Sequence, residues 1–163
     1  MSVETSRGPF TLSTDRSRLD VGVIREFLAR SYWAANIPED VVRRAIEGSL
    51  CFGVYEGARQ VGFGRVVTDS ATFAWISDIF VLPPWRGRGL AQWIVESMRA
   101  HPDLAGIRRW ILATRDAHEV YRRCGFRPLA SPEWFMEIVT SDPYGDGGGA
   151  DAGAAGGGAK DSA

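Results

Sequence analysis

The 163-residue chain has few cysteines and histidines and no long apolar run. Two residues of each type, without a C-x-x-C pair, are too few for a typical structural zinc site, so we expect no metal. No stretch could span a bilayer, and residues 1–9 contain no apolar run of a secretory signal, which favours a cytoplasmic protein without a membrane partner. A net charge of −1 gives no reason to expect a nucleic-acid partner.

The composition is that of a globular protein, with 45% hydrophobic and 24% charged residues. We expect residues 1–9 to be a flexible N-terminus. From Gly145 onward the sequence consists almost entirely of Gly, Ala and Asp and cannot form a core, so residues 143–163 are expected to be a disordered tail. One folded domain over residues 10–142 remains.

Within this domain, the hydrophobic periodicity predicts strands and helices in a mixed order. Two helices, over residues 21–32 and from Pro38 to Gly48, are expected to follow a short first strand at residues 10–14. The remaining expected elements are strands at 50–55, 61–68, 72–82, 110–113 and 134–139, helices at about 90–100 and 117–124, and a further candidate strand near Arg127. This order indicates an α/β fold with a mixed sheet and helices on its faces.

The most informative segment runs from Asp78 to Ala91, where an apolar strand leads through two prolines into a glycine-bearing turn and then a helix. Gly87 and Gly89 allow the backbone to approach a ligand closely, and the free amides at the helix start favour an anion. The turn lacks the Gly-Lys-Ser/Thr of a P-loop and the third glycine of a Rossmann dinucleotide site. It therefore predicts a phosphate-binding loop of another kind, with an ordinary strand-to-helix turn as the alternative.

Three segments, in this order along the chain, resemble the GNAT superfamily of acetyl-CoA-dependent N-acetyltransferases. Asp78-Ile-Phe-Val81 is similar to the family's pantetheine-binding strand, Arg86-Gly-Arg-Gly-Leu-Ala91 to its pyrophosphate loop, and Val120-Tyr-Arg-Arg-Cys-Gly-Phe126 to the helix with its usual catalytic tyrosine. The resemblance extends from about Phe10 to Val139. It implies the GNAT fold, a mixed, mostly antiparallel six- to seven-stranded sheet with about four helices on its faces.

The resemblance also implies acetyl-CoA as cosubstrate, bound where two parallel strands splay apart. The expected contacts are Ile79, Phe80, Val81, Arg86, Gly87, Arg88, Gly89, Leu90, Ala91 and Thr114. Thr114 stands where the family commonly has an asparagine, and a hydroxyl replaces only part of the amide's hydrogen bonding. A backbone amide of the Ile79–Val81 strand is expected to stabilise the acetyl oxygen.

The resemblance makes Tyr121 the candidate general acid. A thiol has a pKa of about 8.5 and a phenol about 10, so a tyrosine can share a proton with the departing thiolate. The alternative is that Tyr121 is a core aromatic of its helix. Cys124 lies on the same helical stripe, but we do not expect an acyl carrier because the family transfers the acetyl group directly.

The general base is less clearly indicated. Asp78 is the only acid in the apolar run from Phe73 to Leu82, which makes it a candidate, with a structural hydrogen-bonding role as the alternative. His118 is a second candidate base. Many family members carry an acid slightly upstream of Asp78, but here Ser77 and Trp75 occupy such places.

For the acceptor, the family places the loop between the first two helices over the substrate. Here this loop contains Tyr32 and Trp33, which with Trp75 would form aromatic walls for a cationic amine; simple packing against the sheet is the alternative. We therefore expect acetyl transfer from acetyl-CoA to a primary amine, of a small molecule, by direct attack through a tetrahedral intermediate. A non-catalytic acyl-CoA-binding or regulatory module and a protein or peptide N-acetyltransferase are the rival functions. An exposed final strand could also pair in a homodimer.

Overall fold

The computed structural model describes residues 2–145, which form one six-stranded sheet with its strands in sequence order. Neighbouring strands are antiparallel except the last pair, which is parallel. The strands are β1 (Glu4–Arg7), β2 (Phe10–Ser13), β3 (Leu50–Glu56), β4 (Arg59–Thr68), β5 (Phe73–Val81) and β6 (Arg109–Ile111). The expected mixed, mostly antiparallel sheet is confirmed.

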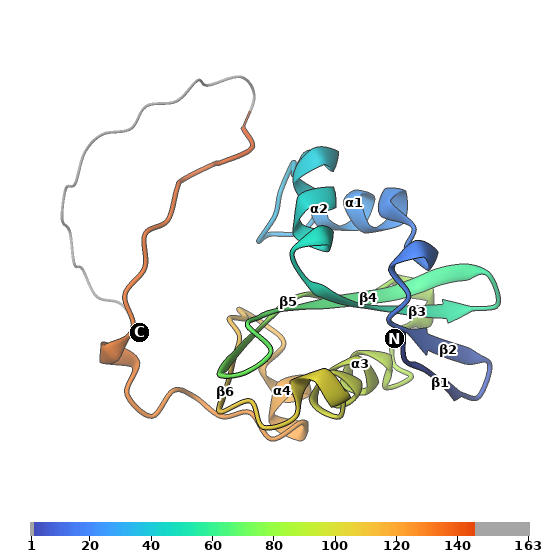
Figure 1. The fold of residues 1–163 in the computed structure, drawn as a ribbon. Coiled ribbons are helices and arrows are strands. Elements are labelled where there is room, and N and C mark those ends of the chain that lie inside the picture. The colour runs from blue at the N-terminus through green and yellow to red at the C-terminus, as the bar shows by residue number, and fades with distance from the viewer. Residues whose placement is uncertain (1, 146–163) are drawn as a thin grey trace.

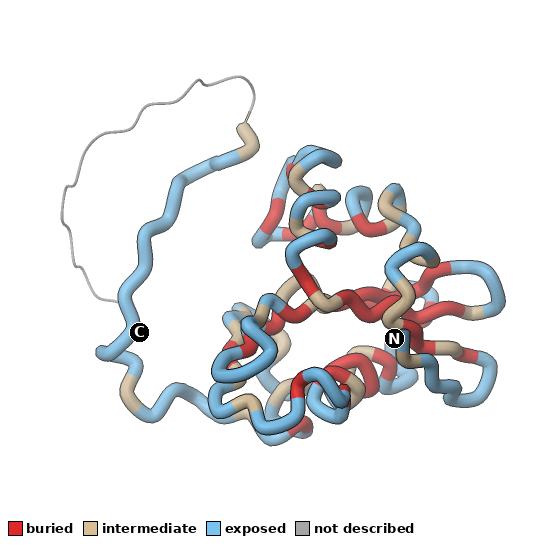
Figure 2. Tube along the Cα trace, viewed as in Figure 1, coloured by how far each residue is buried: buried red, intermediate tan, exposed pale blue. Residues whose placement is uncertain are grey.

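Four described α-helices cover the two faces of this sheet (Figure 1). α1 (Val21–Ala29) and α2 (Glu39–Glu47) lie on one face, and α3 (Leu90–Arg99) and α4 (His118–Arg123) on the other. Buried residues lie along both faces of the sheet (Figure 2), so the core is divided into an α1–α2 cluster and a larger α3 cluster. Short 3₁₀ turns occur at Arg16–Arg18, Pro83–Trp85, Pro102–Leu104 and Pro132–Trp134.

The first helix starts as expected but ends earlier. Asp20 caps α1 by accepting a hydrogen bond from the Val23 amide at 3.0 Å. At its end, the Ser31 hydroxyl donates to the Leu28 carbonyl (2.7 Å) and accepts from the Ala34 amide (3.1 Å). These bonds turn the chain into the loop before α2, so residues 30–32 lie beyond the helix.

The structure corrects the expected flexible N-terminus. Residues 4–7 form β1, which pairs with β2 from Glu4 opposite Ser13 to Arg7 opposite Phe10. All four β1 side chains are exposed, so the strand shows no apolar alternation by which the sequence could have revealed it. Backbone pairing places it in the sheet, together with the ion pairs of Glu4 with Arg18 and of Arg7 with Glu96.

The expected final strand is also corrected. Residues 134–139 have the apolar and aromatic composition of a strand, and residues near Arg127 were a further candidate, but neither segment is a strand. A strand needs a neighbour, and no other described segment pairs with residues 134–139. Tyr144, within the expected tail, packs against the α1–α2 cluster, and residues 146–163 of that tail lie outside the described residues.

Candidate active site

A cleft opens where the two parallel strands separate. β5 pairs with β6 only from Phe73 opposite Arg109 to Trp75 opposite Ile111, after which β6 ends and β5 continues to Val81. The register between β4 and β5 shifts near the point where β6 ends. One residue of β4, Gly64, lies opposite two residues of β5, Asp78 and Ile79. This extra residue is a β-bulge in β5. Asp78 takes a φ of +56° there. The expected splay of the parallel strands is therefore present.

The glycine at position 64 leaves room for side chains that pack over this bulge. A Cβ at Gly64 would overlap the side chains of Ile79, Met98 and Ile94. The Ile79 side chain thus lies close over the β4 backbone, and a larger residue at position 64 would require the ends of the Ile79 and Met98 side chains to move.

The space between the separating segments is a cleft of about 930 Å³. One wall is the β5 segment from Ile76 to Val81, and the other is formed by residues 113–117 with Val120 and Tyr121 of α4. Eleven of the predicted site residues line it together: Tyr32, Trp33, Trp75, Asp78, Ile79, Phe80, Val81, Arg86, Ala91, Thr114 and Tyr121. Residues separated by up to 89 positions along the chain are thus brought to one site.

The four other predicted cofactor residues, Gly87, Arg88, Gly89 and Leu90, do not line this cleft. Gly87 and Gly89 have φ values of +76° and +73°, and Gly89 is the N-cap of α3 without a side-chain cap. The Arg88 guanidinium lies over the Phe10 ring at 5.9 Å, and Leu90 is buried in the core. Of the two loop arginines, Arg86 is therefore the one that lines the cleft, where its Nε donates to the Val81 carbonyl at 2.9 Å.

Tyr121 lies at the cleft with its hydroxyl protonated. Its ring packs edge-on against Phe126, with centroids 6.1 Å apart, and its side chain reaches the cleft. Burial raises the pKa of Tyr121 to about 12, and the neighbouring Tyr32 contributes in the same direction. The phenol is consequently protonated at neutral pH.

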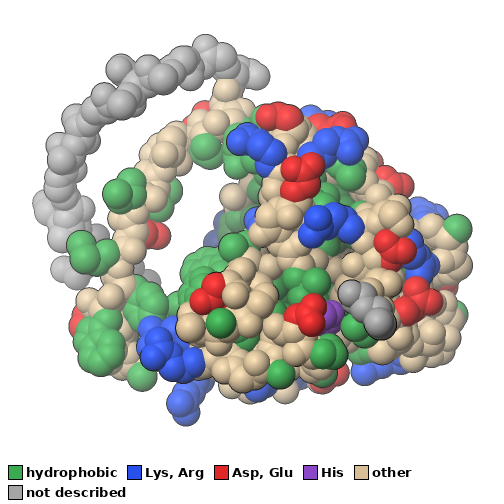
Figure 3. Space-filling view, viewed as in Figure 1, with side chains coloured by type: hydrophobic (Ala, Val, Ile, Leu, Met, Phe, Trp, Pro, Cys, Tyr) green, Lys and Arg blue, Asp and Glu red, His purple; other side chains and the backbone are tan. Residues whose placement is uncertain are grey.

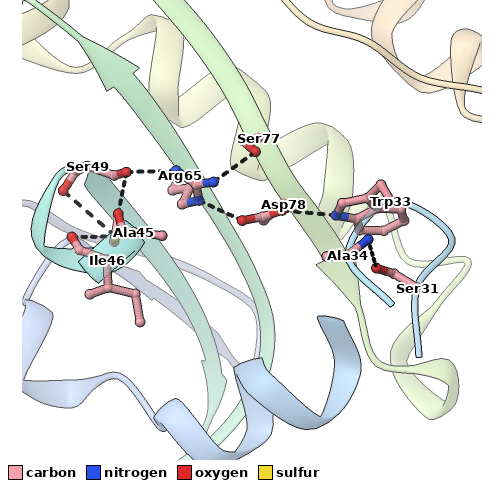
Figure 4. Close-up of polar contacts among 10 residues, drawn as sticks. Ser31, Trp33, Ala34, Ala45, Ile46, Ser49, Arg65, Ser77 and Asp78 are labelled. Atoms are coloured by element: carbon pink, nitrogen blue, oxygen red, sulfur yellow. Dashed lines mark hydrogen bonds and ion pairs between the residues drawn. The ribbon is translucent and has the colours of Figure 1, made fainter. Parts of the chain in front are cut away.

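Asp78 is held by two hydrogen-bond donors from opposite sides (Figure 4). Arg65 Nε donates to Asp78 Oδ2 at 2.6 Å, and Trp33 Nε1 donates to Asp78 Oδ1 at 2.9 Å. Arg65 also donates to the hydroxyls of Ser77 and Ser49. The carboxylate is only 8% exposed and both oxygens are engaged, an arrangement that fits the structural alternative considered from sequence.

The opposite wall is tied to the α1–α2 loop. Tyr32 Oη accepts a hydrogen bond from the Arg115 amide at 2.9 Å, and the Arg115 guanidinium lies over the Tyr32 ring at 3.9 Å. Thr114 Oγ1 accepts from the Ala117 amide at 3.0 Å, next to the start of α4. Arg65 and Arg115 were missed by sequence reasoning, because neither belongs to a motif and each meets its partner only in the folded chain.

Two residues weighed from sequence lie away from the cleft lining. His118 is exposed at the start of α4. Cys124 is buried, with its Sγ 3.9 Å from the Gln92 carbonyl, and burial raises the pKa of its thiol. No helix of the described segment, residues 2–145, is long and apolar enough to cross a membrane.

Comparisons with known proteins agree with this geometry. Residues 47–128 match the family model of an acetyltransferase (GNAT) domain. A protein of Gibberella zeae, provisionally named an acetyltransferase, is 30% identical over 140 residues, which cover 71% of this chain and 77% of that protein. A crystal structure from Xanthomonas campestris pv. campestris, of a protein assigned to the GNAT family, has a TM-score of 0.80 and 48% identity and covers 83% of this chain and 96% of its own.

A more distant structure shows the same fold. An acetyltransferase from Clostridium acetobutylicum, assigned by prediction and solved with acetyl-CoA, has a TM-score of 0.59 and 14% identity, covering 85% of this chain and 96% of its own. The divergent parallel strands and the glycine turn before α3 thus agree with the family match, and the chain belongs to the GNAT acetyltransferase family and is an acyltransferase enzyme.

Proposed function

We propose that the enzyme transfers the acetyl group of acetyl-CoA to a primary amine of a small molecule. The observation that carries this proposal is the single cleft that joins the free side of β5, the Tyr121 hydroxyl and three aromatic side chains. Each of these parts has a distinct task in binding the donor, assisting the leaving group or enclosing the acceptor.

The donor would lie along β5. Beyond Trp75 the strand pairs with β4 alone, so the backbone groups of residues 76–81 on the cleft side are available to the pantetheine arm. Arg86 and the uncapped amides at the start of α3 would take the pyrophosphate at one end. An acetyl oxygen next to a β5 amide would be stabilised as it becomes an oxyanion.

In the reaction, the neutral amine forms a bond to the acetyl carbon, and the carbon–sulfur bond of the tetrahedral intermediate then breaks. The amine nitrogen gives up a proton and the sulfur leaves as a thiolate that takes one. Full transfer from a phenol with a pKa of about 12 to a thiolate of about 8.5 would be uphill by about 5 kcal/mol. Tyr121 therefore assists by donating a hydrogen bond to the sulfur, while the attacking nitrogen supplies the net proton.

Asp78 is proposed as a positioning residue in place of the general base. Because its side chain is largely buried and its two oxygens accept hydrogen bonds from Arg65 and Trp33, we assign the carboxylate to orienting the Trp33 indole at the cleft. The amine would then bind in its neutral form, which is about one molecule in a thousand at pH 7 for a lysine-like amine. Turnover should accordingly rise with pH in the range where the acceptor loses its proton.

The acceptor end favours a small molecule. Trp33, Tyr32 and Trp75 line the cleft with exposed aromatic faces suited to a cationic or polar amine. The Tyr32–Arg115 contacts join the two walls and limit the opening through which an extended peptide would have to pass.

A thiol-release assay over small amines, amino acids, polyamines and peptides tests this proposal, together with calorimetric titration of acetyl-CoA. We expect acetyl-CoA binding and turnover with one or more small amines. Turnover with peptides alone would assign a protein acetyltransferase. Acetyl-CoA binding without turnover on any acceptor would favour the regulatory module.

A further inference from the structure

A second cavity adjoins the cleft on the α1 side of the sheet. We call it the arginine chamber, after Arg30, Arg59, Arg86 and Arg115 in its lining, and its volume is about 730 Å³. Its walls come from α1 and the loop that follows, the start of β4, residues 82–86 and residues 115–116. Six residues line both the cleft and the chamber, so the two spaces are continuous: Phe27, Tyr32, Trp33, Arg86, Arg115 and Asp116.

The charges of the chamber are largely unpaired. Its lining carries four arginines and two carboxylates: Arg30, Arg59, Arg86, Arg115, Glu26 and Asp116. Arg30 and Glu26 pair at 2.9 Å, and the other four groups form no ion pair within residues 2–145. Over the outer surface of α2, by contrast, acidic and basic side chains lie next to one another (Figure 3), and ion pairs join them. The chamber therefore holds an excess of positive charge that the described chain does not neutralise.

Two of the unpaired guanidinium groups are held by aromatic rings. Arg115 lies over the Tyr32 ring at 3.9 Å, and Arg59 lies over the Trp85 ring at 4.6 Å. Trp85 is buried and its Nε1 donates to Glu56 Oε2 at 2.9 Å, so the ring under Arg59 is itself fixed. Neither guanidinium donates a hydrogen bond to another group of residues 2–145. A guanidinium stacked through its face keeps the N–H donors along its edge, in the fork that matches a carboxylate.

This charge distribution selects among acceptors. An anion in the chamber gains charge-assisted hydrogen bonds, whereas a second ammonium group meets guanidinium groups of the same sign. The reacting amine belongs at the aromatic end of the cleft, where the acetyl group is transferred in the proposed reaction. A diamine is therefore disfavoured as acceptor, and a molecule with an amine at one end and a carboxylate at the other is favoured.

The chamber lies at the acceptor end of the cleft and not at the donor end. Tyr32 and Trp33, which line both spaces, belong to the α1–α2 loop. Residues 87–91 of the glycine turn, beside which the donor's pyrophosphate is proposed to bind, do not line the chamber, and neither does any residue of α3 or α4. Those two helices lie on the other face of the sheet (Figure 1). The position thus favours a group of the acceptor over the 3′-phosphate of coenzyme A.

We propose that the acceptor is an amino acid whose carboxylate binds in the arginine chamber while its amine lies in the cleft. The inference rests on the proposed acetyl transfer and narrows its small-molecule acceptor to one class. Arg59 and Arg115 bind the carboxylate, and Arg86 remains with the Val81 carbonyl and the donor. Arg59 lines the chamber but not the cleft, so its substitution reports on the chamber alone.

Acceptors matched in length test the charge preference. For chains of three to seven carbons, the thiol-release assay compares kcat/KM of the ω-amino acid, the alkylamine and the α,ω-diamine. At the best length we expect the ω-amino acid to exceed the alkylamine by about 10-fold or more, as for charge-assisted hydrogen bonds, and the diamine to be the poorest acceptor. Acetylation of alkylamines without an advantage of the ω-amino acid at any length would overturn this inference and leave the proposed function standing.

Arg59→Met tests which residues give the preference. The kcat/KM of the ω-amino acid divided by that of the alkylamine should fall by about 10-fold. Because both values come from the same variant, a loss of active protein cancels. Arg108→Met removes an exposed guanidinium that is also unpaired within residues 2–145 and lies outside the cleft and the chamber, so this matched control should keep the parent's ratio. An equal fall in both variants would assign the preference to overall charge and overturn the proposal.

Calorimetric titrations separate the remaining alternatives. In Arg59→Met, the dissociation constants of acetyl-CoA and 3′-dephospho-acetyl-CoA should keep the parent's ratio; a selective loss of acetyl-CoA affinity would place the coenzyme phosphate in the chamber and overturn the proposal. If no amine is acetylated, the proposed function fails, and the chamber is tested by binding of 5-acetamidopentanoate and N-pentylacetamide to the protein with coenzyme A. Tighter binding of the carboxylate, lost in Arg59→Met, supports the carboxylate site, and equal binding of the two compounds overturns it.

Discussion

The two walls of the cleft differ in how they are held. The β5 wall belongs to a nine-residue strand that pairs with β4, and Asp78 at its bulge is fixed by Arg65 and Trp33. The opposite wall follows a three-residue strand, passes through the irregular residues 112–117 and enters a six-residue helix in which no residue is fully buried. Among the described residues, one hydrogen bond joins this wall to the rest of the cleft, from the Arg115 amide to the Tyr32 hydroxyl.

This difference matches what the proposed reaction requires of each wall. Backbone amides stabilise an oxyanion only if they are fixed before the reaction, which the buried network behind β5 provides. In the proposed reaction the opposite wall contributes a side chain, Tyr121, and its few anchors would allow it to move when substrates enter or products leave. Substitutions behind β5 should therefore mainly lower the free energy of unfolding. Substitutions on the opposite wall should mainly lower kcat.

The largest effect is expected for Arg65→Met. The substitution leaves the Asp78 carboxylate buried without its cation, which costs about 3–5 kcal/mol in the free energy of unfolding. Urea denaturation measures this loss of unfolding free energy. Arg43→Met, which breaks the exposed pair with Glu39 on α2, is the matched control and should cost less than about 0.5 kcal/mol. Equal losses in the two variants would mean that the network does not anchor the β5 wall.

Tyr121→Phe should reduce kcat by about 100-fold or more and leave the acetyl-CoA dissociation constant and the folding stability nearly unchanged. Burial and neighbouring charges, with no hydrogen bond from residues 2–145, account for the raised pKa of Tyr121, so in the proposed reaction removal of its hydroxyl takes away only the donor to the leaving sulfur. Steady-state kinetics and calorimetric titration separate these quantities. Tyr55→Phe, which deletes a buried hydroxyl without a partner on β3, is the control with unchanged kcat.

Tyr32→Phe should have a smaller effect, a few-fold increase in KM. It removes the hydrogen bond from the Arg115 amide, worth about 1 kcal/mol, but keeps the ring under the guanidinium. Arg115→Ala keeps the backbone hydrogen bond to Tyr32 and removes the stacked guanidinium instead. The two variants therefore measure separately what the hydrogen bond and the stacked cation contribute to KM. If neither variant changes KM, the loop does not hold the opposite wall during substrate binding.

The parts that the sequence predicts well are those encoded by neighbouring residues. The strand, prolines and glycines from Asp78 to Ala91 determine the turn before α3, because positive φ values at Gly87 and Gly89 depend on those residues alone. The helices of both faces follow from periodicity and caps such as Asp20. The cleft itself was predictable through the order of three motifs.

Pairings between distant residues could not be predicted in the same way. Arg65 meets Asp78 across a hairpin whose register is shifted by the bulge, and Tyr32 meets Arg115 across 83 positions. β1 is exposed on every side chain and carries no periodic signal, whereas residues 134–139 carry the signal and find no strand within the described chain. Composition predicts the tendency to form a strand, but only the neighbouring segment decides whether one forms.

The smallest effect concerns pH and tests the environment of the opposite wall. Burial raises the pKa of Tyr121 to about 12, so the phenol should remain protonated up to pH 10, where an unperturbed tyrosine would be half ionised. Dividing the kcat of the parent by that of Tyr121→Phe at each pH cancels the titration of the amine. This ratio should be constant from pH 7 to 10, and a twofold fall by pH 10 would show that the phenol is not buried as described.

The same pKa shift has a consequence for folding with a definite sign. A raised pKa means that the folded state favours the protonated phenol, so its contribution to stability is fully present below the unfolded value of about 10 and is lost as the pH rises toward 12. The unfolding free energy of the parent relative to Tyr121→Phe should therefore decline between pH 10 and 12 and be constant below. Tyr55, whose pKa burial also raises to about 12, is present in both proteins, so its titration cancels in the difference and the remaining decline belongs to the wall that carries Tyr121.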